Sequence, residues 1–185
     1  MLAEVMNKNK FTLVVSLPKN DIELVKEALL GGADAVKVHL NVHHFASGVK
    51  YGSFAQEKEF LTEAYALVKE QGKLLGVVPG DGGEYASKED IEAMGNLGVD
   101  FMSTYVEYAP LSLLKNKNIE LCGAIGPDTQ SHLKELCEIE TDIIEASIME
   151  QSDYRKDLSV FDLSKYKRIV AGSNKPVLVP TQKNI

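Results

Sequence analysis

The sequence predicts an α/β fold, a TIM-type (β/α) barrel, and predicts that this barrel is incomplete. From Phe11 onward, short β-branched apolar runs alternate with amphipathic helical stretches, which is typical of parallel strands joined by crossover helices. The unit recurs about seven times without a Gly-rich dinucleotide fingerprint, which favours a barrel over an open sheet. Closure of such a barrel takes eight strands, so we expect the last βα unit to be missing.

Each strand is predicted from a short apolar run that is bounded by turn residues. The predicted strands are Phe11–Leu17, Ala35–Leu40, Leu74–Val78, Phe101–Tyr108, Ile119–Ile125, Ile143–Met149 and Val177–Thr181. The longest segment expected to be irregular is Asn41–Ser53, and Lys- and Asn-rich Met1–Lys10 is not expected to hold a strand.

Helices are predicted from apolar residues at helical spacing together with their capping residues. Asn20 and Asp21 cap the first helix and Gly31 ends it, while Ser87 precedes an acidic first turn in a later one. The predicted helices run from Asp21 to Leu30, Phe54 to Gln71, Ser87 to Leu97, briefly after Pro110, from Thr129 to Glu138 and from Asp162 to Val170.

No shift in composition divides the chain, so we expect residues 1–185 to form one domain. A missing strand would leave two sheet edges with unpaired backbone groups. Either the chain is a fragment or shortened gene product, or a partner chain closes the barrel. We expect a homo-oligomer.

The charge and the cysteines limit the classes of partner and compartment. A net charge of -7 argues against nucleic acid or an anionic membrane as a partner. The first ten residues hold no apolar stretch long enough for a signal peptide or a membrane span. Cys122 and Cys137 lack a CxxC spacing and are expected to be reduced thiols, so we expect a cytoplasmic protein.

The second predicted strand carries the first candidate site residues. Its residues alternate, so that apolar Val36 and Val38 face the helices while Lys37 and His39 face the barrel interior. Active sites in this fold lie at the carboxyl ends of the strands. There, a lysine can bind phosphate or form a Schiff base, and a histidine can move protons.

The fourth and sixth predicted strands add acids and hydroxyls on the same inward side. We expect catalytic roles for Glu107 and Glu145, and substrate binding by residues at the carboxyl ends of these and other strands. The predicted binding residues are Ser16, Ser103, Tyr105, Ser147, Thr181, Gln182 and Lys183. The alternative is an internal ion-pair network that only neutralises Lys37.

Cofactors are not predicted. His39, His43 and His44 lie close in sequence and raise the question of a divalent metal, but they do not share a ligand spacing on a regular element. We therefore expect no metal, and expect the loop histidines to lie at the surface.

The segment from Gly32 to Leu40 resembles the second-strand motif of the ribulose-phosphate-binding barrel superfamily, which includes epimerases, isomerases and decarboxylases of phosphorylated sugars. In the epimerases this strand carries a His and an Asp, two residues apart, that bind metal and shuttle protons. Lys37 and His39 stand at those positions here. A fainter likeness to the copper-homeostasis barrel family lies in Gly82-Gly83-Glu84-Tyr85.

These observations favour a small-molecule enzyme that transfers a proton next to a carbonyl, as an isomerase, an epimerase or an aldolase-like lyase. The expected partner is a small anionic or carbonyl metabolite. The alternatives are a non-catalytic barrel that binds a metabolite or a metal, and a fragment of a longer enzyme.

Overall fold

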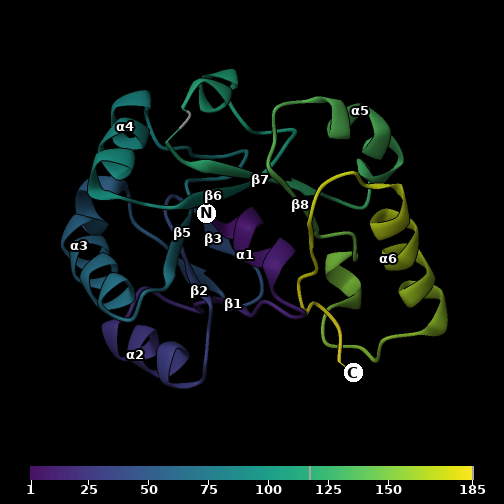
Figure 1. Ribbon diagram of the computed structural model, residues 1–185, viewed down its shortest axis with the longest axis horizontal. Helices are drawn as coiled ribbons and strands as arrows, with labels where there is room; N and C mark the ends of the chain where they lie inside the picture. Colours follow the sequence, from purple (N-terminus) through teal and green to yellow (C-terminus); the bar gives the residue numbers. More distant parts are fainter. Residues whose placement is uncertain (117, 185) are drawn as a thin grey trace.

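The computed structural model describes residues 1–116 and 118–184, and its main feature is a sheet of seven parallel strands. The strands follow one another across the sheet in chain order. They are β1 (Val14–Ser16), β2 (Ala35–His39), β5 (Leu74–Val78), β6 (Phe101–Tyr105), β7 (Glu120–Ile125), β8 (Ile143–Ala146) and β9 (Val177–Leu178). The sheet curls around a central space, and helices cover its outer face (Figure 1).

The covering helices follow the predicted order, and two of them use a predicted capping residue. They are α2 (Ile22–Leu30), α3 (Phe54–Glu70), α4 (Lys88–Leu97), α5 (Leu133–Glu138) and α6 (Val160–Gly172), with 3-10 turns at Leu111–Lys115, Gln130–His132 and Gln151–Asp153. Asp21 and Ser87 cap α2 and α4 through their side chains. No helix in the described ranges is long and apolar enough to cross a membrane.

The curled sheet has two ends, at β1 and at β9. Among the described residues no further strand joins β1 to β9, so the barrel is open along this side. This arrangement confirms the predicted fold class, an incomplete TIM-type barrel with seven strands. The strand pairing shows the open edge directly. β9 pairs with β8 at only two residues, and in the described part of the chain it pairs with no strand on its other side.

Several predicted strands are shorter in the structure. The first begins at Val14 instead of Phe11, whose side chain is 77% exposed. The fourth ends at Tyr105 because the amide of Tyr108 turns back to donate to the Tyr105 carbonyl. The sixth ends at Ala146. Apolar composition therefore overestimates strand length where the chain leaves the sheet.

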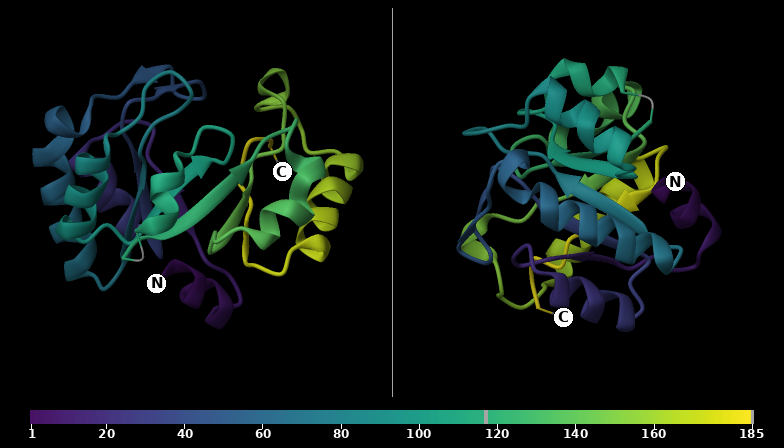
Figure 2. Two further views of the ribbon diagram at one scale, coloured as in Figure 1. Left: turned by 90° about the horizontal axis from the view of Figure 1, so that it is seen from above. Right: turned by 90° about the vertical axis from the view of Figure 1, so that its left-hand side faces the viewer.

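The segment expected to be irregular between β2 and α3 contains a hairpin. Its two short strands, β3 (His43–His44) and β4 (Val49–Lys50), pair in the antiparallel sense. Gly48 has a φ of +69°, which a residue without a Cβ adopts easily, and lies in the turn between them. The hairpin rises over the carboxyl end of the barrel (Figure 2).

The Lys- and Asn-rich amino terminus forms a helix, α1 (Leu2–Lys8), which the sequence analysis does not predict. It lies at the end of the barrel opposite the hairpin (Figures 1 and 2). Leu2 is fully buried and packs with Phe101 and Ile143 from the sheet interior. The carboxylate of Glu120 accepts hydrogen bonds from the amides of Leu2 and Ala3. The helix thus closes the amino-terminal end of the barrel.

We expect Glu120→Ala to loosen α1, because the first-turn amides lose their acceptor. The free energy of unfolding should fall by about 1–2 kcal/mol. Hydrogen exchange of the α1 amides, followed by mass spectrometry, should accelerate. Glu4→Ala is the control, since Glu4 is exposed and pairs only with Lys8 among the described residues. Unchanged exchange in Glu120→Ala would show that this carboxylate does not anchor the helix.

Candidate functional site

The inward side chains of the barrel form three layers, as the two-residue period of the strands requires. The apolar layer at the amino-terminal end holds Ala35, Phe101, Cys122 and Ile143. The middle layer holds Lys37, Ser103 and Glu145. The layer at the carboxyl end holds His39, Tyr105 and Ser147. Gly76 on β5 faces the ring of Phe101, where a Cβ would come within 2.1 Å. The glycine therefore lets the ring fill the barrel below the polar layers.

A cavity of about 820 Å³ lies at the carboxyl ends of the strands and continues along the open side between β1 and β9. Most of the residues predicted to form a site line it. They are Ser16, Lys37, His39, Ser103, Tyr105, Glu145, Ser147, Thr181 and Gln182. The structure thus brings together nine residues from five segments that lie far apart in the sequence.

Two predicted site residues lie outside this cavity lining. Glu107 falls beyond the end of β6 and is exposed. Lys183 forms an ion pair of 2.6 Å with Asp162 in the first turn of α6, and its side chain is only 8% exposed. This contact fastens the segment after β9 to α6. Glu145, and not Glu107, is the acid that the fold places beside Lys37.

The middle layer centres on an ion pair between β2 and β8. Nζ of Lys37 lies 2.9 and 3.0 Å from the two carboxylate oxygens of Glu145, and the Ser103 hydroxyl donates to the same carboxylate at 2.6 Å. Burial alone would raise the pKa of Glu145, but the Lys37 ammonium and the Ser103 hydroxyl lower it below its ordinary value. The carboxylate is therefore charged, and it balances the ammonium.

His39 lies next to this pair in a cluster of three tilted rings. The ring centroids of His44 and Tyr51 are 4.7 and 4.8 Å from that of His39. Burial, the Lys37 charge and His44 lower the pKa of His39 to about 2, so its imidazole is neutral at neutral pH. Its Nδ1 is buried and has no hydrogen-bond partner among the described residues. Leaving a buried polar atom without a partner costs free energy.

A hydroxyl cluster also lines the cavity. The Tyr105 hydroxyl is 2.7 Å from Oγ of Ser147, which also accepts from the Gln182 amide at 2.9 Å. The same amide donates to the Tyr154 hydroxyl. Burial raises the pKa of Tyr105 to about 12, so this hydroxyl keeps its proton and can donate to a ligand oxygen.

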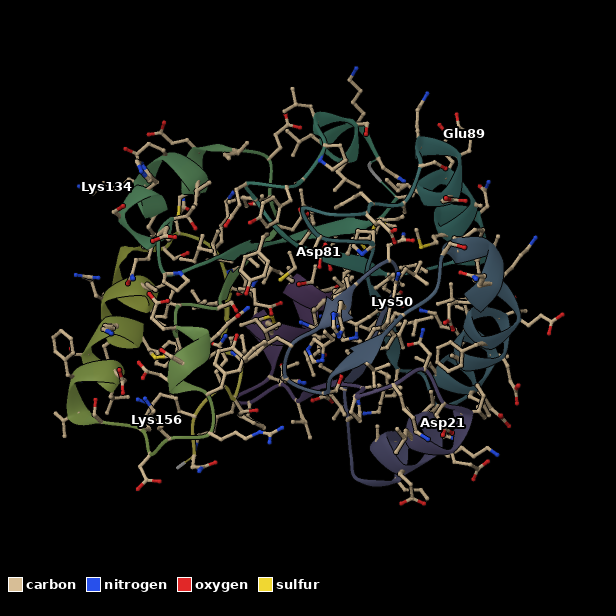
Figure 3. The ribbon with its side chains drawn as sticks, turned by 180° about the vertical axis from the view of Figure 1, so that it is seen from behind. Asp21, Lys50, Asp81, Glu89, Lys134 and Lys156 are labelled. Atoms are coloured by element: carbon tan, nitrogen blue, oxygen red, sulfur yellow. The ribbon has the colours of Figure 1, made fainter. Side chains whose placement is uncertain are left out.

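Two loops meet above the cavity. The Phe45 ring on the hairpin packs edge-on against Tyr154 at 5.7 Å, and Arg155 donates to the Ala46 carbonyl at 2.8 Å. Figure 3 views the molecule from this end, with Lys50 of the hairpin and Asp81 of the loop after β5 near its middle. Lys37 and His39 below these loops are only 7% and 4% exposed, and such burial strengthens electrostatic interactions.

Three ring-bearing residues that contact the predicted site residues are not predicted from the sequence. His44 is partly buried against His39, so the expectation of a surface residue is wrong for this histidine, whereas His43 is exposed. Tyr51 and Tyr154 also enter from long loops. Loop length and aromatic content were the available signals. Within residues 1–116 and 118–184, no three histidine, cysteine, aspartate or glutamate side chains converge as metal ligands.

Comparison with known proteins bears on the fold. No family model matches the sequence, and no curated protein matches it. Among solved structures, the chain is similar to the thiamine phosphate pyrophosphorylase from Pyrococcus furiosus, with a TM-score of 0.63 and 19% identity over 92% of this chain and 75% of that chain. The chain has a TIM-type fold. This fold is compatible with the superfamily resemblance of the second strand, although at 19% identity the likeness shows the fold alone.

We expect Glu145→Gln to destabilise the protein, because it leaves the Lys37 ammonium buried without its anion. The loss in free energy of unfolding should be about 3–5 kcal/mol in urea titrations. The double variant Lys37→Met/Glu145→Leu replaces the pair by apolar side chains and should recover most of that loss. A single-variant loss below about 1 kcal/mol would contradict a buried ion pair.

We expect stability to fall on acidification below about pH 6.5 because of His39. The unfolded chain takes up a proton there, whereas the folded chain holds the His39 pKa near 2. The free energy of unfolding should therefore drop by about 1.4 kcal/mol per pH unit, or about 2 kcal/mol between pH 6.5 and pH 5. The stabilisation from Glu145, whose pKa is lowered, is lost only below its ordinary value of 4.5.

Urea denaturation of the wild type and of His39→Gln, at about pH 7 and about pH 5, measures this contribution. The wild type should lose about 2 kcal/mol more than the variant. His44, whose pKa is also lowered, is present in both proteins, so the difference isolates His39. Equal losses would mean that the His39 ring is accessible to protons in the folded state.

Proposed function

We propose that the protein is an enzyme that transfers a proton at the carbon next to the carbonyl of a small metabolite. The observation that carries the proposal is the juxtaposition of a neutral His39, whose Nδ1 lacks a partner, with the Lys37–Glu145 pair in one cavity. Enolate formation needs hydrogen-bond donors and positive charge at the carbonyl oxygen, and a base at the neighbouring carbon.

Each group has a part in this reaction. The Lys37 ammonium stabilises negative charge on the carbonyl oxygen, and the Glu145 carboxylate accepts the proton from carbon. His39 is neutral, so it acts as a hydrogen-bond donor to the substrate oxygen and not as an imidazolium acid. The Tyr105 and Ser147 hydroxyls hold a second oxygen of the substrate.

Charge balance indicates which group of the substrate reaches Lys37. Glu145 already neutralises this ammonium and would repel a phosphate that approached it. We therefore propose that an uncharged carbonyl lies at the base of the cavity. A phosphate ester, where the substrate carries one, would lie nearer the mouth, beside Tyr105, Ser147 and Thr181.

The test is deuterium exchange in heavy water, followed by proton NMR. Dihydroxyacetone, glyceraldehyde and their phosphate esters serve as substrates. We expect the wild type to accelerate exchange of the protons next to the carbonyl by at least about 100-fold for one of them. Lys37→Arg and His39→Gln should each lower the rate by about 10-fold or more.

Lys69→Met is the matched control, since Lys69 pairs with Asp100 on the outside of the sheet. This variant should catalyse exchange of the substrate protons at the wild-type rate. Absence of exchange across the panel would contradict the proposal. If a compound then bound without exchange of its protons, the barrel would be a non-catalytic binding module. In that case Glu145 would serve only to neutralise the charge of Lys37.

A further inference from the structure

The amine of Lys37 differs from the other paired amines of the protein in its surroundings. Lys69 and Lys73 pair with Asp100 and Asp34, and their side chains are one-third exposed. Lys183 is buried in its ion pair but does not line the cavity. Among the described lysines, Lys37 alone has an amine that is both held by a buried carboxylate and on the cavity lining.

This contact supplies what an amine nucleophile requires. An ammonium must first lose a proton, and the Glu145 oxygens lie at hydrogen-bond distance to accept it. In a buried site, transfer within the pair replaces two opposite charges by two neutral groups without loss of a proton to water. The Ser103 hydroxyl holds the carboxylate in place for this transfer.

We propose that Lys37 forms a protonated Schiff base with the carbonyl carbon of an aldehyde or ketone substrate, and that Glu145 is its proton acceptor and donor. This inference rests on the proposed function and deepens it. It defines the substrate class as small aldehydes and ketones that have a hydrogen or a cleavable carbon–carbon bond beside the carbonyl.

The steps balance in atoms and charge. A proton moves from Nζ of Lys37 to Glu145, the nitrogen lone pair forms a bond to the carbonyl carbon, and the π pair moves to oxygen. A proton then passes from nitrogen to oxygen to give the carbinolamine. Its hydroxyl leaves as water with the proton held by Glu145, while the nitrogen lone pair forms the C=N bond. Overall, ammonium and carbonyl become iminium and water, and the carboxylate is regenerated.

The covalent route also suits the bases present. His39 and Glu145 both have lowered pKa values and are weak bases toward a carbon acid. An iminium withdraws electrons more strongly than a carbonyl, so the neighbouring C–H bond is easier to ionise. The regenerated Glu145 carboxylate lies beside it to take that proton.

Borohydride trapping tests the proposal. The folded protein is incubated with dihydroxyacetone and sodium borohydride, and the modified lysines are located by peptide mass spectrometry. We expect an adduct on Lys37 at a level at least about 10-fold above that on Lys69, because a positioned amine outcompetes a surface one. Equal modification of the two lysines, or none on Lys37, would overturn the proposal.

Lys37→Arg is the decisive variant, because arginine keeps the charge opposite Glu145 but cannot form an imine. It should fold, as judged by circular dichroism, and give no adduct at position 37 while Lys69 is modified as before. Exchange of substrate protons without trapping would overturn the Schiff base and leave the proposed function intact. Trapping without exchange would support the Schiff base and contradict proton transfer, and loss of both would overturn both proposals.

Discussion

The ion pair between Lys37 and Glu145 is the contact on which the arrangement of the site depends. It joins β2 to β8 across the barrel interior, between residues that are 108 apart in the sequence. Neither charge could stay buried alone, so β2 and β8 must face each other at the level of the middle layer. The layer above the pair holds His39, Tyr105 and Ser147, and the last two contact each other through their hydroxyls.

The layers on either side of the pair determine how far its charges are buried. Below it, the ring of Phe101 and the helix α1 close the barrel with apolar side chains. Above it, the hairpin and the β8–α6 loop meet through Phe45 and Tyr154. The pair therefore lies with its side chains only 9% and 8% exposed, where a neutral imidazole and a charged amine–carboxylate pair are both favourable. This environment makes the polar layers suited to carbonyl chemistry.

The sequence was most informative where a local period decides the structure. Alternation along β2 predicted that Lys37 and His39 face inward while Val36 and Val38 face the helices, and the same rule held for Glu145 on β8. It was least informative at segments with no such period. The helix α1 has too few residues for a clear amphipathic pattern, and its stability comes from Leu2 and Glu120, which only the folded barrel brings together.

By itself, therefore, the sequence determined the order of strands and helices, the incomplete barrel and the inward set of polar residues, because these follow from periods of two and 3.6 residues along the chain. Only the tertiary structure decided which acid meets Lys37, why the His39 imidazole is neutral, how His44 and Tyr154 line the cavity and how Tyr51 packs against His39. Those properties depend on distance and burial between segments far apart in the chain, and no local pattern encodes them.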